Sequence, residues 1–297
     1  MGDTINISVI TSLYRCEKFL VAYLQAVSQM TNLYECEFIL VHNDPTNEEL
    51  EIIRNFDDSN VLINHLIVER EGLYSSWNRA IRLSRGKYLT VWNVDDLRFA
   101  DSINLQARAL DNDPKAAIAY GDIYGSVVYG QTSEKLYRFP EWKQNRFEFY
   151  RSYLMSCFQM WRKGVHDKVG YYDEQFRCVG DFDFQVRTAM HYSFVKVAVP
   201  LGVYLEDQPH KISSNGSQAL ENNIVYWRYG VYEKIQFHLL FKSLAAYKKS
   251  QFLFGGKWFS NAEKSPFSLG YRIKGMAKGI FTSPLHFSKT LIKRYLR

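Results

Sequence analysis

The sequence predicts an α/β fold built on a mostly parallel central sheet with helices on both faces. Short apolar runs alternate with longer amphipathic segments over the first 122 residues. Strands that alternate with helices of this length form mostly parallel sheets. The chain has 297 residues, of which 46% are hydrophobic, enough for one large core with an appendage.

The elements follow in order along the chain. Strands are expected at residues 5–11, 36–42, 60–68, 88–92 and 116–122, the first two of them buried, and helices at 16–30, 48–56, 73–88 and 103–113. Gly86 is expected to close the third helix as a C-cap, and Asp101 or Ser102 to cap the fourth. After residue 123 the alternation fades. The pattern there predicts a hairpin or irregular edge at 125–139, a helix that begins near Asp181, a strand at 194–206 and one or two long helices at 214–254.

Charge is unevenly distributed. The net charge is +6, but the segment from Lys264 to the C-terminus holds eight Lys or Arg and no acid, so the rest of the chain carries −2. This balance argues against a nucleic-acid-binding body and for a local anionic contact of the tail. If the apolar side chains of the tail lie on one face, the tail would bind an anionic membrane surface. The alternative is an ordinary helix pair that packs on the body. The apolar side chains are Phe281, Leu285, Phe287, Leu291 and Ile292.

No targeting or membrane-spanning segment is evident. The N-terminus lacks the pattern of a signal peptide, and the most apolar later stretch, near Lys242, is too short to cross a bilayer. A cytoplasmic protein, with peripheral contact to the inner face of the membrane as an option, is therefore expected.

Polar clusters follow three predicted strands, at residues 11–15, 42–46 and 93–96. Ligands of parallel α/β sheets bind beyond the carboxyl ends of the strands, where these clusters meet. Asp95 and Asp96 are adjacent like charges, which either cap the next element or hold Mg²⁺ or Mn²⁺ through their oxygens.

Two further places carry candidate chemistry. Asp181 and Asp183 stand at a helix start, where one of them caps the helix or faces a cleft as a general base. His210 lies in a loop rich in turn formers, either solvated or as a ligand of a metal or phosphate. Gly72 precedes a helix, but neither GxGxxG nor GxxxxGK[ST] occurs, so a Rossmann dinucleotide site or a P-loop is unsupported.

Five motifs in this order resemble a family 2 glycosyltransferase of the GT-A, nucleotide-diphosphosugar transferase type. The resemblance covers about residues 5–215, with the stretches ISVITSLYRCEKFL, FILVHNDPTNEEL, EGLYSSWNRAIRLSRGKYLTVWNVDD, VGYYDEQFRCVGDFDFQVRTA and PHKISSN. Asn93 takes the place of the first Asp of the family's DXD motif and Asp95 that of the second. Gly180 replaces the Glu that usually precedes the base, and Asn43 replaces an Asp that often contacts uracil.

The resemblance implies a division and a set of roles. Residues 1–217 would be the catalytic domain, with a nucleotide-binding part (1–122) and an acceptor-binding part (123–217), and residues 218–297 a helical, basic extension. Asp181 would be the catalytic base, and a divalent cation, Mn²⁺ or Mg²⁺, would be held by Asp95, Asp96 and His210. The donor nucleotide would be bound by Thr11, Ser12, Tyr14, Asn43, Asn78, Asn93 and Asp95.

The implied reaction is inverting transfer of a sugar from a nucleotide-sugar donor, UDP favoured, to a hydroxyl of a glycan or lipid-linked glycan in surface polysaccharide assembly. Two alternatives stay open. One is a sugar nucleotidyltransferase, which usually carries a Gly-rich basic loop that SLYRCEKF lacks. The other is a non-catalytic relative that binds nucleotide sugars or glycans, against which the presence of Asp95 and Asp181 argues.

Overall fold

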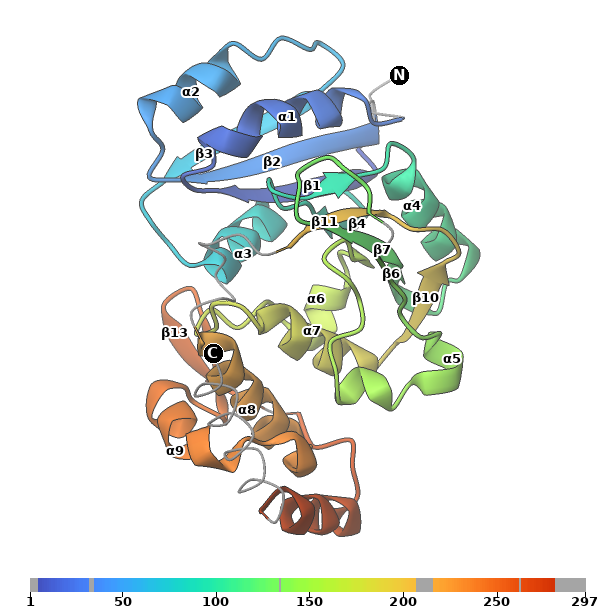
Figure 1. The fold of residues 1–297 in the computed structure, drawn as a ribbon, viewed down its shortest axis with the longest axis vertical. Helices are drawn as coiled ribbons and strands as arrows, with labels where there is room; N and C mark the ends of the chain where they lie inside the picture. Colours follow the sequence, from blue (N-terminus) through green and yellow to red (C-terminus); the bar gives the residue numbers. More distant parts are fainter. Residues whose placement is uncertain (1–4, 32–34, 134, 207–215, 262, 281–297) are drawn as a thin grey trace.

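A computed structural model of the protein describes residues 5–31, 35–133, 135–206, 216–261 and 263–280. Its centre is a seven-stranded sheet in the spatial order β10-β6-β9-β4-β1-β2-β3 (Figure 1). Among these strands only β9 runs against the others. The strands are β1 (Ile7–Leu13), β2 (Cys36–Asn43), β3 (Leu62–Val68), β4 (Tyr88–Val91), β6 (Ala116–Gly121), β9 (Met160–Arg162) and β10 (Ser193–Val197). The mostly parallel α/β fold is confirmed.

Helices cover both faces of this sheet. One face carries α1 (Glu17–Ser28), α2 (Asn47–Arg54) and α4 (Ser102–Asn112), and the other carries α3 (Leu73–Leu83), α6 (Val165–Val169) and α7 (Gly180–Ala189) (Figure 1). β2 is buried along its whole length, as expected for a strand covered on both faces. α2 begins with a capping box, in which Thr46 and Glu49 each satisfy the other's backbone N–H.

A second, four-stranded sheet lies next to the carboxyl end of β4. Its order is β5-β11-β7-β8, from β5 (Leu97–Arg98), β11 (Gly202–Leu205), β7 (Ile123–Ser126) and β8 (Leu136–Tyr137). The single strand predicted at 194–206 is wrong, because the segment breaks near Pro200 and places β10 and β11 in different sheets. The predicted hairpin at 125–139 is found as β7 and β8. Two short helical segments, α5 (Trp142–Asn145) and η2 (Glu148–Tyr150), lead from there towards β9.

The C-terminal part packs under α7 (Figure 1). It consists of α8 (Ser217–Tyr229), η4 (Tyr232–Lys234), α9 (Phe237–Ala246), β12 (Gln251–Phe254), β13 (Lys257–Ser260) and a helix at residues 269–280. The expected helices are present, but the prediction that they continue to residue 254 is wrong, since 251–260 form a hairpin. Ile224, Val225 and Tyr229 of α8 belong to the same core cluster as α7. Residues on both sides of the predicted domain boundary at 217 therefore share one core. The division into two domains stays a prediction.

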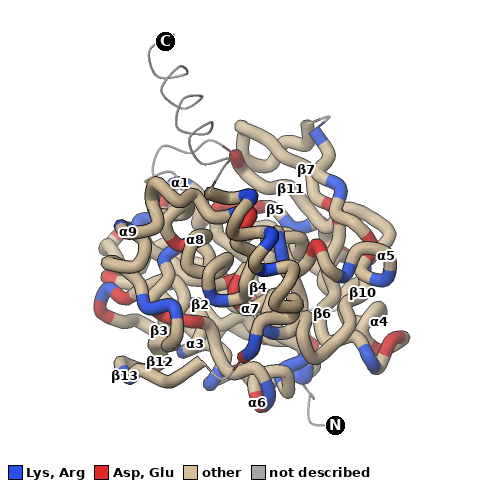
Figure 2. Tube along the Cα trace, turned by 90° about the horizontal axis from the view of Figure 1, so that it is seen from below, with Lys and Arg blue, Asp and Glu red and all other residues tan. Residues whose placement is uncertain are grey.

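Figure 2 shows Lys and Arg interspersed with Asp and Glu over the body, in line with its near-balanced charge. No helix within the described residues is both long and apolar enough to cross a membrane. The apolar tail side chains from Phe281 onward lie outside the described residues, so the membrane contact predicted for them stays a prediction.

Gly86 has a role other than the expected C-cap. α3 ends at Leu83 with Ser84 as its C-cap, and Gly86 lies flat against β1. A methyl group on Gly86 would sit 2.6 Å from the Ser8 nitrogen, closer than any ordinary contact. The position thus requires glycine for close approach of two backbones.

Gly86→Ala is therefore expected to lower the free energy of unfolding by about 1–3 kcal/mol through overpacking. Urea denaturation followed by circular dichroism measures this change. The control is Gly270→Ala, where the added methyl group meets nothing within 4 Å and stability should hold or rise. Equal stability of the two variants would contradict the close-approach argument.

Candidate active site

The three polar clusters predicted from the sequence meet at one edge of the sheet. β4, β1 and β2 are parallel neighbours, so their carboxyl ends face the same edge of the sheet, although β4 ends at Val91, opposite Ile10. The Thr11 hydroxyl donates to the Trp92 carbonyl at 2.8 Å, and the Asn43 amide donates to the Ser12 hydroxyl at 3.3 Å. The edge therefore joins residues that are up to 81 positions apart in sequence.

Two residues of this edge are fully buried and engaged within the protein. The amide nitrogen of Asn43 lies within hydrogen-bonding distance of Ser12 and Ser76, and its oxygen accepts the N–H of Glu71 at 3.0 Å. Thr11 is bonded to Trp92 and to the Tyr23 hydroxyl. Both residues hold the strand ends together, and their predicted contacts with a nucleotide stay predictions.

The segment after β4 presents its carboxylates in two different ways. Asp96 is buried; one oxygen accepts the Leu205 N–H at 3.0 Å and the other accepts the Asn93 amide at 3.0 Å. These bonds tie the loop to β11. Asp95 is half-buried beside it. Asp96 thus supports the loop, and Asp95 is the better placed of the two to reach a ligand.

Aromatic hydroxyls that the sequence did not single out surround this pair. Burial, with the nearby carboxylates of Asp96 and Asp95, raises the pKa of Tyr129 to about 12. The same two carboxylates and burial also raise the pKa of Tyr204. Tyr129 comes from the β7–β8 connection and packs its ring on Phe19 of α1. The acidic segment is therefore covered from two sides by phenols.

The donor atoms fit a cation that is shared with phosphate. Within the described ranges no three His, Cys, Asp or Glu side chains group as a metal site, and His210 lies outside those ranges. Mg²⁺ sites commonly use one or two carboxylates and complete their shell with substrate phosphates and water. Asp95 could supply one carboxylate to such a cation. The side-chain carbonyl oxygen of Asn93 could be a second ligand, because the amide nitrogen of Asn93 is already bonded to Asp96.

Asp181 lies in the first turn of α7 in a largely aromatic setting. Its carboxylate accepts the Phe182 N–H at 2.8 Å and the Tyr74 hydroxyl at 3.3 Å. Burial raises the pKa of Asp181 to about 6, against the opposing effect of these hydrogen bonds and of Tyr153. A carboxylate with such a pKa is ionised at neutral pH yet more basic than an ordinary Asp, as a general base requires.

Gly180 and Tyr74 fit together beside this carboxylate. A methyl group on Gly180 would sit 2.7 Å from the Tyr74 ring, so the ring occupies the space that a side chain at 180 would need. Tyr74 is also held by a stacked Tyr172 ring and an edge-on Trp77 ring. α3 therefore supplies a fixed hydroxyl to Asp181.

α8 supports the same turn from the other side. The buried carboxylate of Glu221 accepts the backbone N–H groups of Arg177, Cys178 and Val179 at 2.9–3.1 Å. These are the residues that lead into α7. Glu221 therefore fixes the approach to Asp181, a role for which the sequence pattern held no signal.

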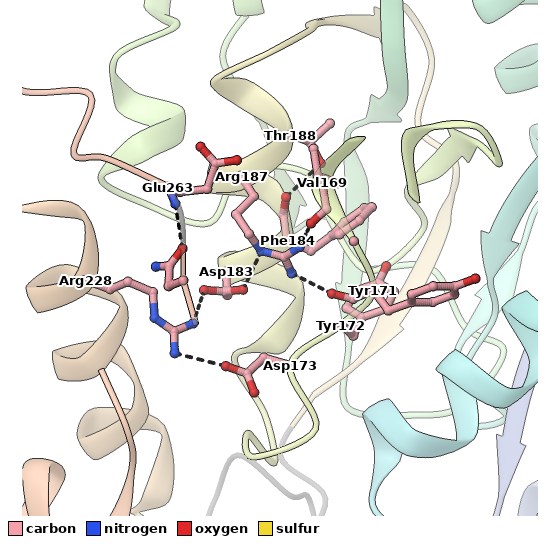
Figure 3. A network of polar contacts seen from close by, with 12 residues as sticks. Val169, Tyr171, Tyr172, Asp173, Asp183, Phe184, Arg187, Thr188, Arg228 and Glu263 are labelled. Carbon is pink, nitrogen blue, oxygen red and sulfur yellow. Dashed lines mark hydrogen bonds and ion pairs between the residues drawn. The ribbon is translucent and has the colours of Figure 1, made fainter. Parts of the chain in front are cut away.

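Asp183, the other candidate for the general base at this helix start, is part of a buried ion network (Figure 3). Its carboxylate accepts Arg187 at 2.9 Å and Arg228 at 2.6 Å, and these guanidinium groups lower the pKa of Asp183. Arg228 also binds Asp173 at 3.0 Å. Two acids and two bases thus neutralise one another and join α7 to α8.

The chain between residues 153 and 159 links the Asp181 region to the Asp95 region. β9 is antiparallel to β4, so the segment before it leaves at the carboxyl end of β4. The Arg98 guanidinium, just after the acidic segment, donates to the Phe158 carbonyl at 3.2 Å. Tyr153, six residues before Gln159, interacts with Asp181. The carboxylates of Asp95 and Asp181 therefore both lie towards the edge of the sheet at which the parallel strands end.

The remaining predicted residues have clear positions. Asn78 is buried and pairs with the Tyr172 backbone in both directions at 2.9 Å, which fixes the loop before α7. Tyr14 is exposed at the end of β1, with the Arg70 guanidinium 3.5 Å from its ring centre. Nothing tests their predicted contacts with a nucleotide.

Two solved structures share the fold of this chain. The crystal structure of S. aureus TarS 1-349 in complex with UDP-GlcNAc aligns with 93% of this chain and 71% of that chain, at a TM-score of 0.60 and 15% identity. The mannosyltransferase PcManGT from Pyrobaculum calidifontis, in complex with GDP-Man and Mn²⁺, aligns with 82% of this chain and 65% of that chain, at 0.52 and 14%. The predicted GT-A fold is confirmed.

The family follows from the sequence. Residues 8–172, more than half of the chain, match the model of glycosyl transferase family 2, and the chain belongs to that family. An uncharacterized glycosyltransferase of Methanocaldococcus jannaschii is 27% identical over 197 residues, 63% of this chain and 66% of the relative. A PGL/p-HBAD biosynthesis glycosyltransferase of Mycobacterium tuberculosis is 27% identical over 154 residues, 50% of this chain. The chain spans 66% and 56% of the length of these two relatives.

Proposed function

We propose that this protein transfers a sugar from a nucleotide-diphosphate donor to a hydroxyl group, with inversion at the anomeric carbon and with Asp181 as the base. The observation that carries the proposal is the Asp181 carboxylate, whose pKa of about 6 results from its largely aromatic surroundings on the side of the sheet that also holds Asp95. Family membership supplies the reaction class.

Asp181 accepts the proton of the acceptor hydroxyl as its oxygen attacks the anomeric carbon, and the bond from that carbon to the diphosphate breaks. One base acting in a single displacement inverts the configuration. Asp95 would hold a divalent cation, which would act as a Lewis acid and offset the charge of the diphosphate leaving group. Asp96 and Asn93 keep the loop that carries Asp95 in place.

UDP is the proposed nucleotide and Mn²⁺ or Mg²⁺ the proposed cation. Of the two solved structures, that of TarS contains UDP-GlcNAc, and that of PcManGT contains GDP-Man with Mn²⁺. A glycan or lipid-linked glycan is the proposed acceptor. A role in polysaccharide assembly rests on family analogy.

Asp95→Asn is expected to weaken Mn²⁺-dependent binding of UDP by tenfold or more, since it removes the carboxylate proposed to hold the cation. Isothermal titration with UDP, with and without Mn²⁺, measures the effect. The control is Asp167→Asn, an exposed carboxylate of α6, which follows β9 at the opposite end of β4, and this variant should bind as the unchanged protein does. Unaltered metal-dependent binding in Asp95→Asn would exclude Asp95 as the cation ligand.

Tyr74→Phe is expected to move the acid limb of the kcat/KM profile to higher pH. The Tyr74 hydroxyl donates to the ionised form of Asp181 and so lowers its pKa; without this bond the pKa rises above about 6, and more alkaline conditions are needed to ionise the base. Tyr23→Phe, a buried tyrosine bonded to Thr11, is the control. An unmoved limb would show that Tyr74 has no part in tuning the base.

A non-catalytic nucleotide-sugar-binding relative is the alternative to be tested. It predicts that UDP-sugars raise the melting temperature of the protein while no hydrolysis or transfer is seen with any metal. The proposed transferase predicts both stabilisation and slow donor hydrolysis. A sugar nucleotidyltransferase would instead form UDP-sugar and pyrophosphate from UTP and a sugar 1-phosphate, which a pyrophosphate-release assay detects.

A further inference from the structure

A group of exposed apolar side chains lies on the C-terminal part of the protein. It consists of exposed side chains from α9 and from the helix at residues 269–280: Phe241, Leu244, Leu269, Ile273 and Ile280. We call these five side chains the C-terminal apolar surface. Phe241 is 87% exposed and Leu269 and Ile273 are 65% and 60% exposed, values unusual for large apolar residues.

Two glycines orient the helix at residues 269–280. Gly275 and Gly279, one turn apart, face the body and are buried. A methyl group on Gly279 would sit 2.6 Å from the Phe237 ring and 2.7 Å from the Tyr232 carbonyl oxygen, so the helix backbone lies directly on η4 and the start of α9. The orientation of the helix is therefore set by close packing.

With that side against the body, the helix presents an apolar stripe to solvent. Leu269, Ile273 and Ile280 follow at spacings of four and seven, which places them on one face of a helix. On α9, Phe241 and Leu244 continue the stripe that begins at Phe237, where Gly279 packs. The Gly279–Phe237 contact joins the two helices, which lie in the lower part of the molecule in Figure 1.

Charge indicates what covers this surface. From Lys264 to Ile280 the chain has four basic residues and no acid, and Lys274 and Lys278 are exposed on the same helix. α9 has Lys242 next to Phe241 and no acid. Apolar side chains flanked by lysines match a bilayer with anionic headgroups, in which the side chains enter the acyl boundary and the lysines stay at the phosphates.

We infer that the C-terminal apolar surface docks the protein onto an anionic lipid bilayer. This inference does not depend on transfer activity. It needs no residue beyond 280. Residues 281–297 include four basic residues and no acid, so they add charge of the same sign.

The test is co-sedimentation of the full chain with vesicles of phosphatidylcholine, alone or with about a third phosphatidylglycerol. Binding to the anionic vesicles and its loss in high salt are expected, because exposed charges are screened by salt. Ile273→Glu should reduce binding at least tenfold. The matched control is Ile67→Glu, which starts from the same residue at the same 60% exposure on the edge strand β3 and adds the same charge. It should bind nearly as the unchanged protein does.

A double substitution of Lys274 and Lys278 to Ala should weaken anionic binding by more than tenfold, at about fivefold per lysine. Absence of binding by the unchanged protein would overturn the inference. Equal binding by Ile273→Glu and Ile67→Glu would overturn it as well, since attraction would then reside elsewhere in the chain. Self-association that Ile273→Glu abolishes, without vesicle binding, would assign the surface to a second copy of the chain instead.

Discussion

Asp181→Asn is expected to lower kcat for sugar transfer by about 10²–10⁴-fold, the range that a general base contributes. The amide has nearly the same shape but cannot accept a proton from the acceptor hydroxyl. Donor binding should be unchanged, because the Asp95 loop keeps its bonds to Asn93 and Leu205. Transfer or hydrolysis of a UDP-sugar measures kcat, and titration with UDP measures binding.

The same substitution is expected to raise the melting temperature at pH 7–8. The folded-state pKa of Asp181, about 6, lies above the value of roughly 3.9 for an unfolded Asp, so the folded state binds the proton more tightly. Stability therefore falls as pH rises from about 4 through 6, and at neutral pH the buried charge is a cost that Asn removes. Calorimetry at pH 5 and pH 8 should show the larger gain at pH 8.

Asp167→Asn is the control for both effects, since Asp167 is an exposed carboxylate of the short helix α6. It should change neither kcat nor the melting temperature. If Asp181→Asn kept more than a tenth of the activity, Asp181 would not be the base. Lost activity together with a lower melting temperature would indicate damage to the fold instead.

Arg228→Met is expected to lower the free energy of unfolding by about 3–5 kcal/mol, as for removal of one partner from a buried ion pair. Arg228 bridges Asp183 and Asp173 (Figure 3). It also donates to the carbonyl groups of Lys248, Lys249 and Gln251. Without it the buried Asp183 keeps its ion pair with Arg187, but the buried Asp173 loses the ion pair that it makes with Arg228. Urea unfolding monitored by tryptophan fluorescence gives the change.

The matched control is Arg108→Met, an exposed arginine on α4 where the same substitution should cost less than about 0.5 kcal/mol. A loss of under about 1 kcal/mol in Arg228→Met would mean that the network contributes little. Because α7 also carries Asp181, the variant should lose activity at temperatures below its global unfolding transition.

The parallel half of the fold was predictable because its signals are local. Each strand from β1 to β6 except the two-residue β5 lies in a short, mostly apolar stretch, and the intervening helices show their own periodicity. β9 was not predicted, since three residues carry no recognisable period and become a strand only between β4 and β6. The β12–β13 hairpin was mistaken for helix for a related reason: its ends are held by Arg228 and Asp173, far away in sequence.

The candidate site divides in the same way. Asp95 and Asp181 could be proposed from residue type and position after a strand or at a helix start. Their supports could not, because each is a contact between distant segments: the Tyr74 hydroxyl bonds to Asp181 over 107 positions, and Glu221 reaches Val179 over 42. Asn43 and Asn78 were predicted as ligand contacts, whereas their bonds in the structure are internal. An amide in a polar turn has the same sequence pattern in either role.

The position of β9 has a consequence for how the chain is made. β4 and β6 are not bonded to each other; Met160–Arg162 fill the gap between them. A nascent polypeptide that has not yet emerged past Arg162 from the ribosome therefore holds the four-stranded fragment β4-β1-β2-β3, whose β4 edge is open and can pair with another chain, while β6 still lacks both of its neighbours, β9 and β10. Translation that stops short of this point should yield insoluble product, and completion of the sheet must await the second half of synthesis.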